Sequence, residues 1–209
     1  YVKESREMDR EAYTRGTSVY LVDRVIPMLP RELSNGICSL NPKEDRLAFS
    51  VFMEIDHRGN VVNHRIEESV IRTSERMVYE DVTRILEEND PELVERYRPL
   101  VEDFHDMETL SRILRKKRMH RGSIDFDLDE AKIILDIKGK PIDVKPYERG
   151  ISNKIIEEFM LVCNETVAEY MTWNEVPFLY RIHEEPTVEK LLEFNEFIHN
   201  FGYHLKGIG

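Results

Sequence analysis

The residues with the clearest capacity for chemistry in this 209-residue chain are acidic, and they gather at Asp125, Asp127 and Asp129. Together with Asp136, the twelfth position counted from Asp125, they follow the spacing of a calcium-binding loop. That loop needs Gly at its sixth position for a sharp turn and a bidentate Glu at its twelfth. Because the chain has Glu130 and Asp136 at these positions, the acidic run does not predict a calcium site.

Histidine and cysteine do not supply another reactive centre. The seven histidines are scattered, and the closest pair, His199 and His204, lacks the further ligands that a zinc site requires. Cys163 belongs to an apolar stripe with helical spacing, where a thiol is usually buried and inert. The sequence patterns of phosphate-binding loops, dinucleotide-binding folds, zinc proteases, serine hydrolases and CxxC oxidoreductases are all missing. These enzyme classes are therefore excluded.

The charge of the chain weighs against nucleic-acid binding over its whole surface. It has 30 Lys and Arg against 41 Asp and Glu, a net charge of −11. Sequence-independent binding to phosphates normally rests on Lys and Arg. Residues 112–121 are the exception, since this stretch is rich in Lys and Arg and holds no acid. It is typical either of a solvated helix end or of a local phosphate contact.

The sequence also indicates the cellular compartment in which the protein is expected. The longest apolar run, residues 159–163, is far shorter than the roughly 18 residues of a membrane span. The N-terminus lacks the apolar core of a secretory signal, and Cys38 and Cys163 make a poor disulfide framework. We therefore expect a cytoplasmic protein with no membrane partner. Because the chain opens on Tyr1 rather than Met, we expect it to be a piece of something longer.

The elements that must position any site are predicted to be hairpins and helices. Residues 46–56 and 61–71 are apolar and β-branched and flank a short turn, as do residues 131–137 and 141–147 around a turn at 138–140. Shorter extended segments are expected at 18–22 and 178–182. Helical spacing covers five segments, 6–15, 75–88, 91–117, 151–172 and 187–200.

Two further patterns refine this picture. Residues 25–42 contain three prolines and Asn35-Gly36, which predicts an ordered loop without a long regular element. In the helix at 151–172, we expect one stripe to be buried, and it comprises Ile155, Phe159, Val162, Cys163 and Tyr170. Because strands come in hairpins rather than alternating singly with helices, the predicted class is α+β with antiparallel pairing. No linker divides the chain, so we expect one domain or part of one.

Four stretches of the chain resemble the catalytic RNB domain of the ribonuclease II and ribonuclease R family, and within it bacterial ribonuclease R most. They lie in family order and cover nearly the whole chain, at residues 15–56, 121–133, 155–170 and 177–186. The resemblance implies that antiparallel hairpins form part of a β-barrel-like core surrounded by helices. It also implies that residues 1–209 are the central part of a single RNB domain, truncated at both ends.

The function implied by the resemblance is processive, hydrolytic 3′–5′ exoribonuclease activity that releases nucleoside 5′-monophosphates. In such enzymes the 3′ end of single-stranded RNA threads through a channel to a buried site containing Mg²⁺. Binding inside a channel needs positive groups only locally. The implied activity is therefore compatible with the acidic net charge of the chain.

The resemblance assigns a nucleotide clamp to two aromatic residues. Tyr20, in TSVYLV, matches the family tyrosine that packs on the 3′-terminal nucleotide, and Phe126, in SIDFDL, matches the phenylalanine on its other side. Stacking suits an enzyme without sequence preference because every base has a π-face. Without the family, both residues would be interpreted as ordinary core aromatics of strands.

Other RNA contacts are implied further from the 3′ end. Tyr79 and one of the adjacent pair Glu157 and Glu158 match residues that touch the RNA there, although an amphipathic helix explains the same residues. Arg15 and the basic run 115–121, including Arg121, are candidate phosphate contacts.

The metal site is expected to lie outside this chain. In the family, the aspartates that bind Mg²⁺ precede the matched stretch and an arginine-bearing segment follows it, so we expect no catalytic residue and no metal ligand here. Metal-assisted hydrolysis needs the ions to activate water and neutralise developing charge. We therefore expect the chain alone to be inactive. Its missing partners would be the rest of the RNB domain and OB-type RNA-binding domains, and bare apolar surface would favour self-association.

Two other interpretations remain open. The chain could come from a non-catalytic RNA-binding or regulatory relative that lacks the metal site. It could also be an unrelated acidic α+β interaction module, in which case Tyr20 and Phe126 would lie far apart with no cleft between them.

Overall fold

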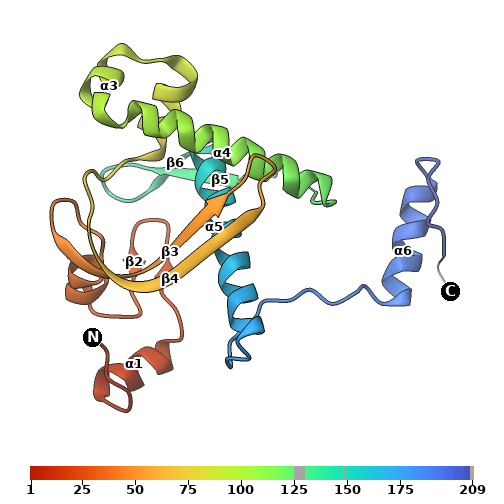
Figure 1. Cartoon of the computed structure of the whole chain (residues 1–209), viewed down its shortest axis with the longest axis horizontal. Coiled ribbons are helices and arrows are strands. Elements are labelled where there is room, and N and C mark those ends of the chain that lie inside the picture. The colour runs from red at the N-terminus through yellow and green to blue at the C-terminus, as the bar shows by residue number, and fades with distance from the viewer. Residues whose placement is uncertain (125–129, 148, 208–209) are drawn as a thin grey trace. The chain divides into compact units, whose positions relative to one another are not determined.

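The computed structural model describes residues 1–124, 130–147 and 149–207, and Figure 1 shows the order of their elements. The chain divides into two compact units, Tyr1–Val167 and Ala168–Gly209, which are considered separately. Phe126 lies outside the described residues.

The first unit begins with a helix and a minimal hairpin. Helix α1 (Glu7–Arg15) ends at Gly16, whose positive φ of 68° lets its N–H donate to the carbonyl of Ala12. Strands β1 (Val19–Tyr20) and β2 (Val25–Ile26) then pair antiparallel. Residues 25–42, with their three prolines, contain only the short strand β2 and one helical turn, η1 (Glu32–Ile37). The prediction that this loop lacks a long regular element is confirmed.

The longest sheet element is the hairpin of β3 (Asp45–Ile55) and β4 (Val61–Arg72), as predicted. Asp56 closes its turn by accepting hydrogen bonds at 2.8 Å from the backbone N–H groups of Arg58 and Asn60. The hydrogen bonds from Asn60 are the main reason why the pKa of Asp56 is lowered to about 2. The turn of the next hairpin, β5 (Glu130–Leu135) and β6 (Pro141–Tyr147), repeats this arrangement around Asp136.

The helices between the hairpins differ from the prediction. They are α2 (Tyr79–Thr83), η2 (Arg84–Glu88), α3 (Pro91–Arg96), η3 (Arg98–Leu100) and α4 (Val101–His120). The helix expected at 91–117 is therefore interrupted near Pro99, because proline has no N–H to donate and its ring clashes with the carbonyl four residues earlier. The predicted start at residue 91 is confirmed, and the carboxylate of Asp90 caps it by accepting from the N–H groups of Glu92 and Leu93.

These helices hold the core of the first unit. Ile85, Tyr97 and Phe104 are buried together and are flanked by partly buried side chains from the same helices. The tip of the β3–β4 hairpin lies against α4, where Lys117 Nζ donates to the carbonyl of Gly59 over 2.9 Å (Figure 1). The hairpins form three separate two-stranded sheets within the described residues, not a closed barrel. The α+β class with antiparallel hairpins is confirmed.

The long helix α5 (Ile151–Trp173) was predicted with the right bounds but with a different buried face. Ile155 is buried, whereas Phe159, Val162 and Cys163 are only partly so. Tyr170 is exposed, which corrects the predicted stripe. The positions of α5 that are buried along with Ile155 are polar, namely Ser152, Glu158 and Thr166. Hydrogen bonds to neighbouring elements, rather than apolar packing alone, therefore decide the orientation of this face.

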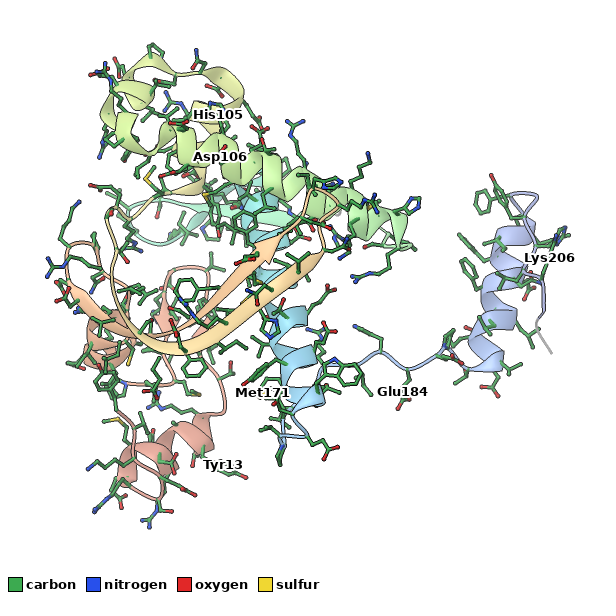
Figure 2. All side chains as sticks on the ribbon, viewed as in Figure 1. Tyr13, His105, Asp106, Met171, Glu184 and Lys206 are labelled. Atoms are coloured by element: carbon green, nitrogen blue, oxygen red, sulfur yellow. The ribbon has the colours of Figure 1, made fainter. Side chains whose placement is uncertain are left out.

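The second unit contains the end of α5, an extended stretch and helix α6 (Val188–His199), whose N-cap is Thr187. The strand expected at 178–182 is wrong. Figure 2 shows that the chain around Glu184 runs without regular structure, and no strand of the described residues pairs with it. Leu179 is 96% exposed there, so its apolar sequence is not matched by burial. None of the described helices is long and apolar enough to cross a membrane.

The start of α5 depends on the absence of a side chain at Gly150. A Cβ at this position would lie 2.3 Å from Oγ1 and 2.7 Å from Cγ2 of Thr83 on α2. Thr83 is β-branched and its hydroxyl bonds that of Ser152 at 2.7 Å, so it has little freedom to move away. We predict that Gly150→Ala lowers the free energy of unfolding by about 1–3 kcal/mol, measured by urea denaturation.

The matched control for this prediction is the double variant with Thr83→Ala. Since removing the Thr83 side chain relieves part of the clash, the two substitutions should couple, and the double variant should lose less stability than the sum of the single variants. Strict additivity would contradict the proposed contact.

Candidate functional site

Tyr20 is presented on the short β1–β2 hairpin with its side chain open to solvent. It is 79% exposed and pairs with Val25 in the strand register. The hairpin is anchored at its base, where the Met28 N–H donates to Ser18 Oγ over 2.9 Å. The ring is therefore free to stack on a flat ligand. Its proposed partner Phe126 lies outside the described residues, so the pairing of the two rings stays a prediction.

Arg15 lies just before this hairpin in the chain and contacts residues on both sides of it. Its Nε donates to Glu11 at 2.8 Å, and Nη1 reaches the carbonyl of Pro27 at 3.4 Å. Arg15 thus ties the end of α1 to the segment after β2. A phosphate would have to share this side chain with Glu11.

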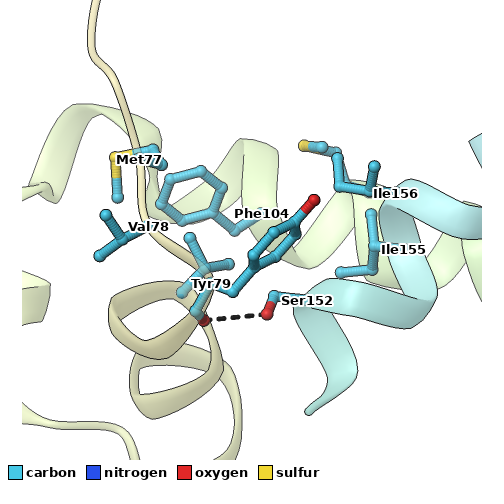
Figure 3. Close-up of a pocket in the computed structure, with 9 residues that line it drawn as sticks. Met77, Val78, Tyr79, Phe104, Ser152, Ile155 and Ile156 are labelled. Atoms are coloured by element: carbon cyan, nitrogen blue, oxygen red, sulfur yellow. Dashed lines mark hydrogen bonds between the residues drawn. The ribbon is translucent and has the colours of Figure 1, made fainter. Parts of the chain in front are cut away.

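Tyr79 begins α2 and borders an apolar cavity of about 240 Å³. Figure 3 shows its ring among the side chains of Phe104, Ile155 and Ile156. The hydroxyl of Ser152 donates to the Tyr79 carbonyl over 2.9 Å and fixes the start of α5 against α2. The side chain of Tyr79 is 46% exposed, so the ring lies at the rim of the cavity rather than inside the core.

The adjacent residues Glu157 and Glu158 have different environments. Glu158 is only 3% exposed and accepts hydrogen bonds from Nε and Nη2 of Arg118, the shortest at 2.6 Å. The remaining nitrogen of Arg118, Nη1, donates to Ser123 Oγ at 2.7 Å. Glu157 is partly exposed and pairs mainly with Arg149, and its other oxygen lies 3.9 Å from Nη2 of Arg118. Glu158 therefore joins α5 to α4, whereas Glu157 faces a more open surface.

The basic run is largely tied to the rest of the chain. Arg121 forms an ion pair with Glu165 at 2.6 Å, and the hydrogen bond from that pair raises the pKa of the guanidinium. Arg121 and Glu158 line the same cavity of about 30 Å³ beside α4 and α5. Tyr79 borders the apolar cavity instead, and Tyr20 and Arg15 border neither. The predicted residues are thus distributed over several surfaces.

A wider groove was not anticipated from the sequence. It has a volume of about 730 Å³ and runs between α2–η2, the β5–β6 hairpin and the start of α5. We call it the basic groove, because three acidic residues line it, Glu80, Glu87 and Glu88, against five cationic ones: Arg84, Lys132, Lys145, Arg149 and Lys154. Its basic residues are spread over more than 60 positions, and only the register of β5 and β6, which pairs Lys132 with Lys145, could have indicated it.

Metal ligands do not gather in the part of the chain that the structure describes. No group of three or more His, Cys, Asp or Glu side chains there is arranged to hold an ion. His199 and His204 approach each other, with 3.3 Å between their Nδ1 atoms, as a pair without a third such ligand. The described donor set therefore does not fit a Mg²⁺ site of clustered carboxylates.

Proteins with similar sequences are bacterial ribonucleases. Ribonuclease R 1 of Lactococcus lactis is 47% identical over 207 residues, which are 99% of this chain and 25% of that protein. Ribonuclease R of Thermotoga maritima is 48% identical over 207 residues, which are 99% of this chain and 29% of that protein. The chain thus spans less than a third of the length of these curated relatives.

Solved structures share the fold, and the family follows from the sequence. Mycoplasma genitalium RNase R in complex with ribose methylated single-stranded RNA matches with a TM-score of 0.86 and 30% identity, over 97% of this chain and 31% of that one. Yeast Ssd1, described as a pseudonuclease, matches with a TM-score of 0.73 over 99% of this chain and 25% of that one. At 20% identity, that match shows the fold alone. The RNB domain model matches residues 1–207, and the chain belongs to the RNB domain family.

Proposed function

We propose that this chain is part of a processive, hydrolytic exoribonuclease that degrades RNA from its 3′ end to nucleoside 5′-monophosphates. The observation that carries the proposal is the identity of 47% and 48% with two proteins named ribonuclease R over 99% of the chain. The structure of Mycoplasma genitalium RNase R with bound single-stranded RNA supports RNA as the substrate. Because the chain spans only a fraction of these relatives, the activity belongs to the longer protein.

Within that protein, we propose that the chain supplies the central part of one RNB domain. The Mg²⁺ ligands would come from outside it, since the described residues provide no cluster of carboxylates. Bound Mg²⁺ would activate water and neutralise the charge that develops on the phosphate. The isolated chain should then be inactive. It should also self-associate, because apolar side chains of β3 such as Leu47 and Phe49 are largely exposed.

The part of the reaction that this chain serves is holding the RNA. Tyr20 and Phe126 would grip the 3′-terminal base between their rings, and each stacked base contributes about 1–3 kcal/mol without sequence preference. The high exposure of Tyr20 and the anchored base of its hairpin support this role. The ring can then bind one base after another as the RNA shortens.

The remaining predicted residues divide into contacts and supports. Tyr79 and Glu157 are partly exposed, so we propose that they touch the RNA upstream of its end. Glu158 is buried against Arg118, and its role would be to fix α5 in place. Arg15 and Arg121 are paired with carboxylates, and a phosphate would compete with those partners.

A non-catalytic relative is the second candidate function. It is favoured by one observation, the shared fold of yeast Ssd1, which is described as a pseudonuclease. The RNB fold by itself therefore does not establish nuclease activity. A direct assay separates the two candidates.

The proposed activity is tested with the full-length protein that carries this chain. Incubated with single-stranded RNA and Mg²⁺, it should release nucleoside 5′-monophosphates from the 3′ end, and EDTA should abolish the release. The product is identified by chromatography. The 209-residue chain alone is the matched control and should release none. Tight RNA binding by the full-length protein without any mononucleotide product would favour the non-catalytic relative instead.

The clamp is tested by Tyr20→Ala in the same protein. Because the last nucleotides lose a stacking partner, the enzyme should release the RNA earlier and leave longer end products, resolved on a denaturing gel. Tyr13→Ala is the control, since Tyr13 lies on α1 and is 89% exposed but has no proposed contact with RNA (Figure 2). End products of unchanged length for Tyr20→Ala would refute its assigned role.

The division between Glu157 and Glu158 predicts opposite phenotypes. Glu158→Gln removes the carboxylate that bonds the largely buried guanidinium of Arg118 and leaves it only the more distant carboxylate of Glu157, at 3.9 Å, so we expect a loss of about 3 kcal/mol in unfolding free energy. Glu157→Gln removes a partly exposed pair and should cost less than about 1 kcal/mol. Urea denaturation measures both. Equal losses for the two variants would show that the buried ion pair does not have the structural role described.

A further inference from the structure

The hairpin that carries Tyr20 is short, and the side chains of its strands are exposed. Strands β1 and β2 pair Val19 with Ile26 and Tyr20 with Val25, and within the described residues they form a two-stranded sheet of their own. All four side chains are at least 40% exposed. A two-stranded hairpin without a buried apolar face is only marginally stable in water. Contacts outside the two strands must therefore fix the direction in which Tyr20 points.

At the base of this hairpin a side chain replaces a backbone acceptor. When the register of β1 and β2 is continued, Pro27 faces Ser18, and proline has no N–H with which to extend the pairing. The next N–H along the chain is that of Met28, and it donates to Ser18 Oγ over 2.9 Å. Ser18 is partly buried, unlike the four residues of the strands. Its hydroxyl therefore closes the hairpin where the backbone pairing stops.

The other side-chain contact at the base of the hairpin is weaker. Arg15 Nη1 donates to the carbonyl of Pro27 over 3.4 Å, which is longer than the roughly 2.7–3.2 Å of a well-formed N–H···O bond. The same guanidinium also bonds Glu11 at 2.8 Å, so it is shared between two acceptors. The bond between Ser18 and Met28 is therefore the better-formed of the two contacts.

We propose that Ser18 is a positioning residue for Tyr20. Its hydroxyl fixes the base of the hairpin two residues before the ring, and thereby holds the ring where it can stack on the 3′-terminal base. Without the hydroxyl, the Met28 N–H would lose its acceptor and the hairpin would sample more orientations. The RNA would then have to order the hairpin on binding, at a cost in affinity. The proposal rests on the proposed function, because it assumes that Tyr20 grips the RNA, and it assigns no RNA contact to Ser18 itself.

The test measures the affinity of the full-length protein for a short, fluorescently labelled single-stranded RNA with a free 3′ end, by anisotropy in EDTA so that no hydrolysis occurs. Ser18→Ala should weaken binding about 2- to 10-fold, the range that corresponds to one intramolecular hydrogen bond. Ser18→Thr keeps the hydroxyl and suits a strand, so it should retain the affinity of the parent. The matched control is Thr17→Ala. It removes an exposed neighbouring hydroxyl that bonds the Ser18 carbonyl rather than β2, and it should bind like the parent.

A double variant separates positioning from a direct or a general structural role. Because Ser18 acts through the ring, Ser18→Ala combined with Tyr20→Ala should bind no more weakly than Tyr20→Ala alone. Additive losses would contradict the proposal, as would a loss that Ser18→Thr does not restore. Since the bond is not part of the buried core, Ser18→Ala should melt at the temperature of the parent. A large fall in its melting temperature would show a general structural role instead.

The release of mononucleotides with Mg²⁺, measured on the same proteins, keeps this proposal apart from the nuclease activity. Parent-like affinity of Ser18→Ala, in a protein that releases mononucleotides, would overturn the role of Ser18 and leave the proposed function intact. Weaker binding that depends on Tyr20, in a protein that releases none, would support the role of Ser18 and refute the nuclease.

Discussion

The buried contact between Arg118 and Glu158 is the interaction on which the arrangement of the first unit depends. Two charges have been removed from water, and they are tolerated because the guanidinium also donates to Ser123 and the geometry satisfies both partners. This contact fixes α4 to α5. The same two helices carry walls of the apolar cavity beside Tyr79, and the start of α5 is a wall of the basic groove. The Arg118–Glu158 ion pair therefore helps to position walls of both the apolar cavity and the basic groove.

A second constraint acts at the other end of the same interface. Gly150 lets the start of α5 approach Thr83, and the hydroxyls of Ser152 and Thr83 then bond each other. The polar face of α5 thereby takes over part of the role that apolar packing has in larger cores. This is consistent with the small number of fully buried apolar side chains in the described residues. The orientation of α5 is therefore set by hydrogen bonds of defined direction.

Sequence patterns were sufficient for elements with local causes. Both long hairpins and the start of α3 at Pro91 follow from residues adjacent in the chain, and each lies within a residue or two of its predicted bounds. The break near Pro99 was missed because apolar periodicity continues across it. The strand expected at 178–182 failed since alternation alone does not provide a pairing partner. The partner of Glu158 could not be foreseen, because that contact joins residues 40 positions apart in sequence.

The two Asp-centred turns have a consequence for the order in which the chain acquires structure. In each, one carboxylate collects the N–H groups two and four residues later, so the loop closes without help from any distant residue. β-Hairpins of this kind form within about 1–10 microseconds. Docking of α4 on α5 must instead await a collision between segments some 40 positions apart. A newly synthesised chain should therefore form the β3–β4 and β5–β6 hairpins well before α4 packs against α5.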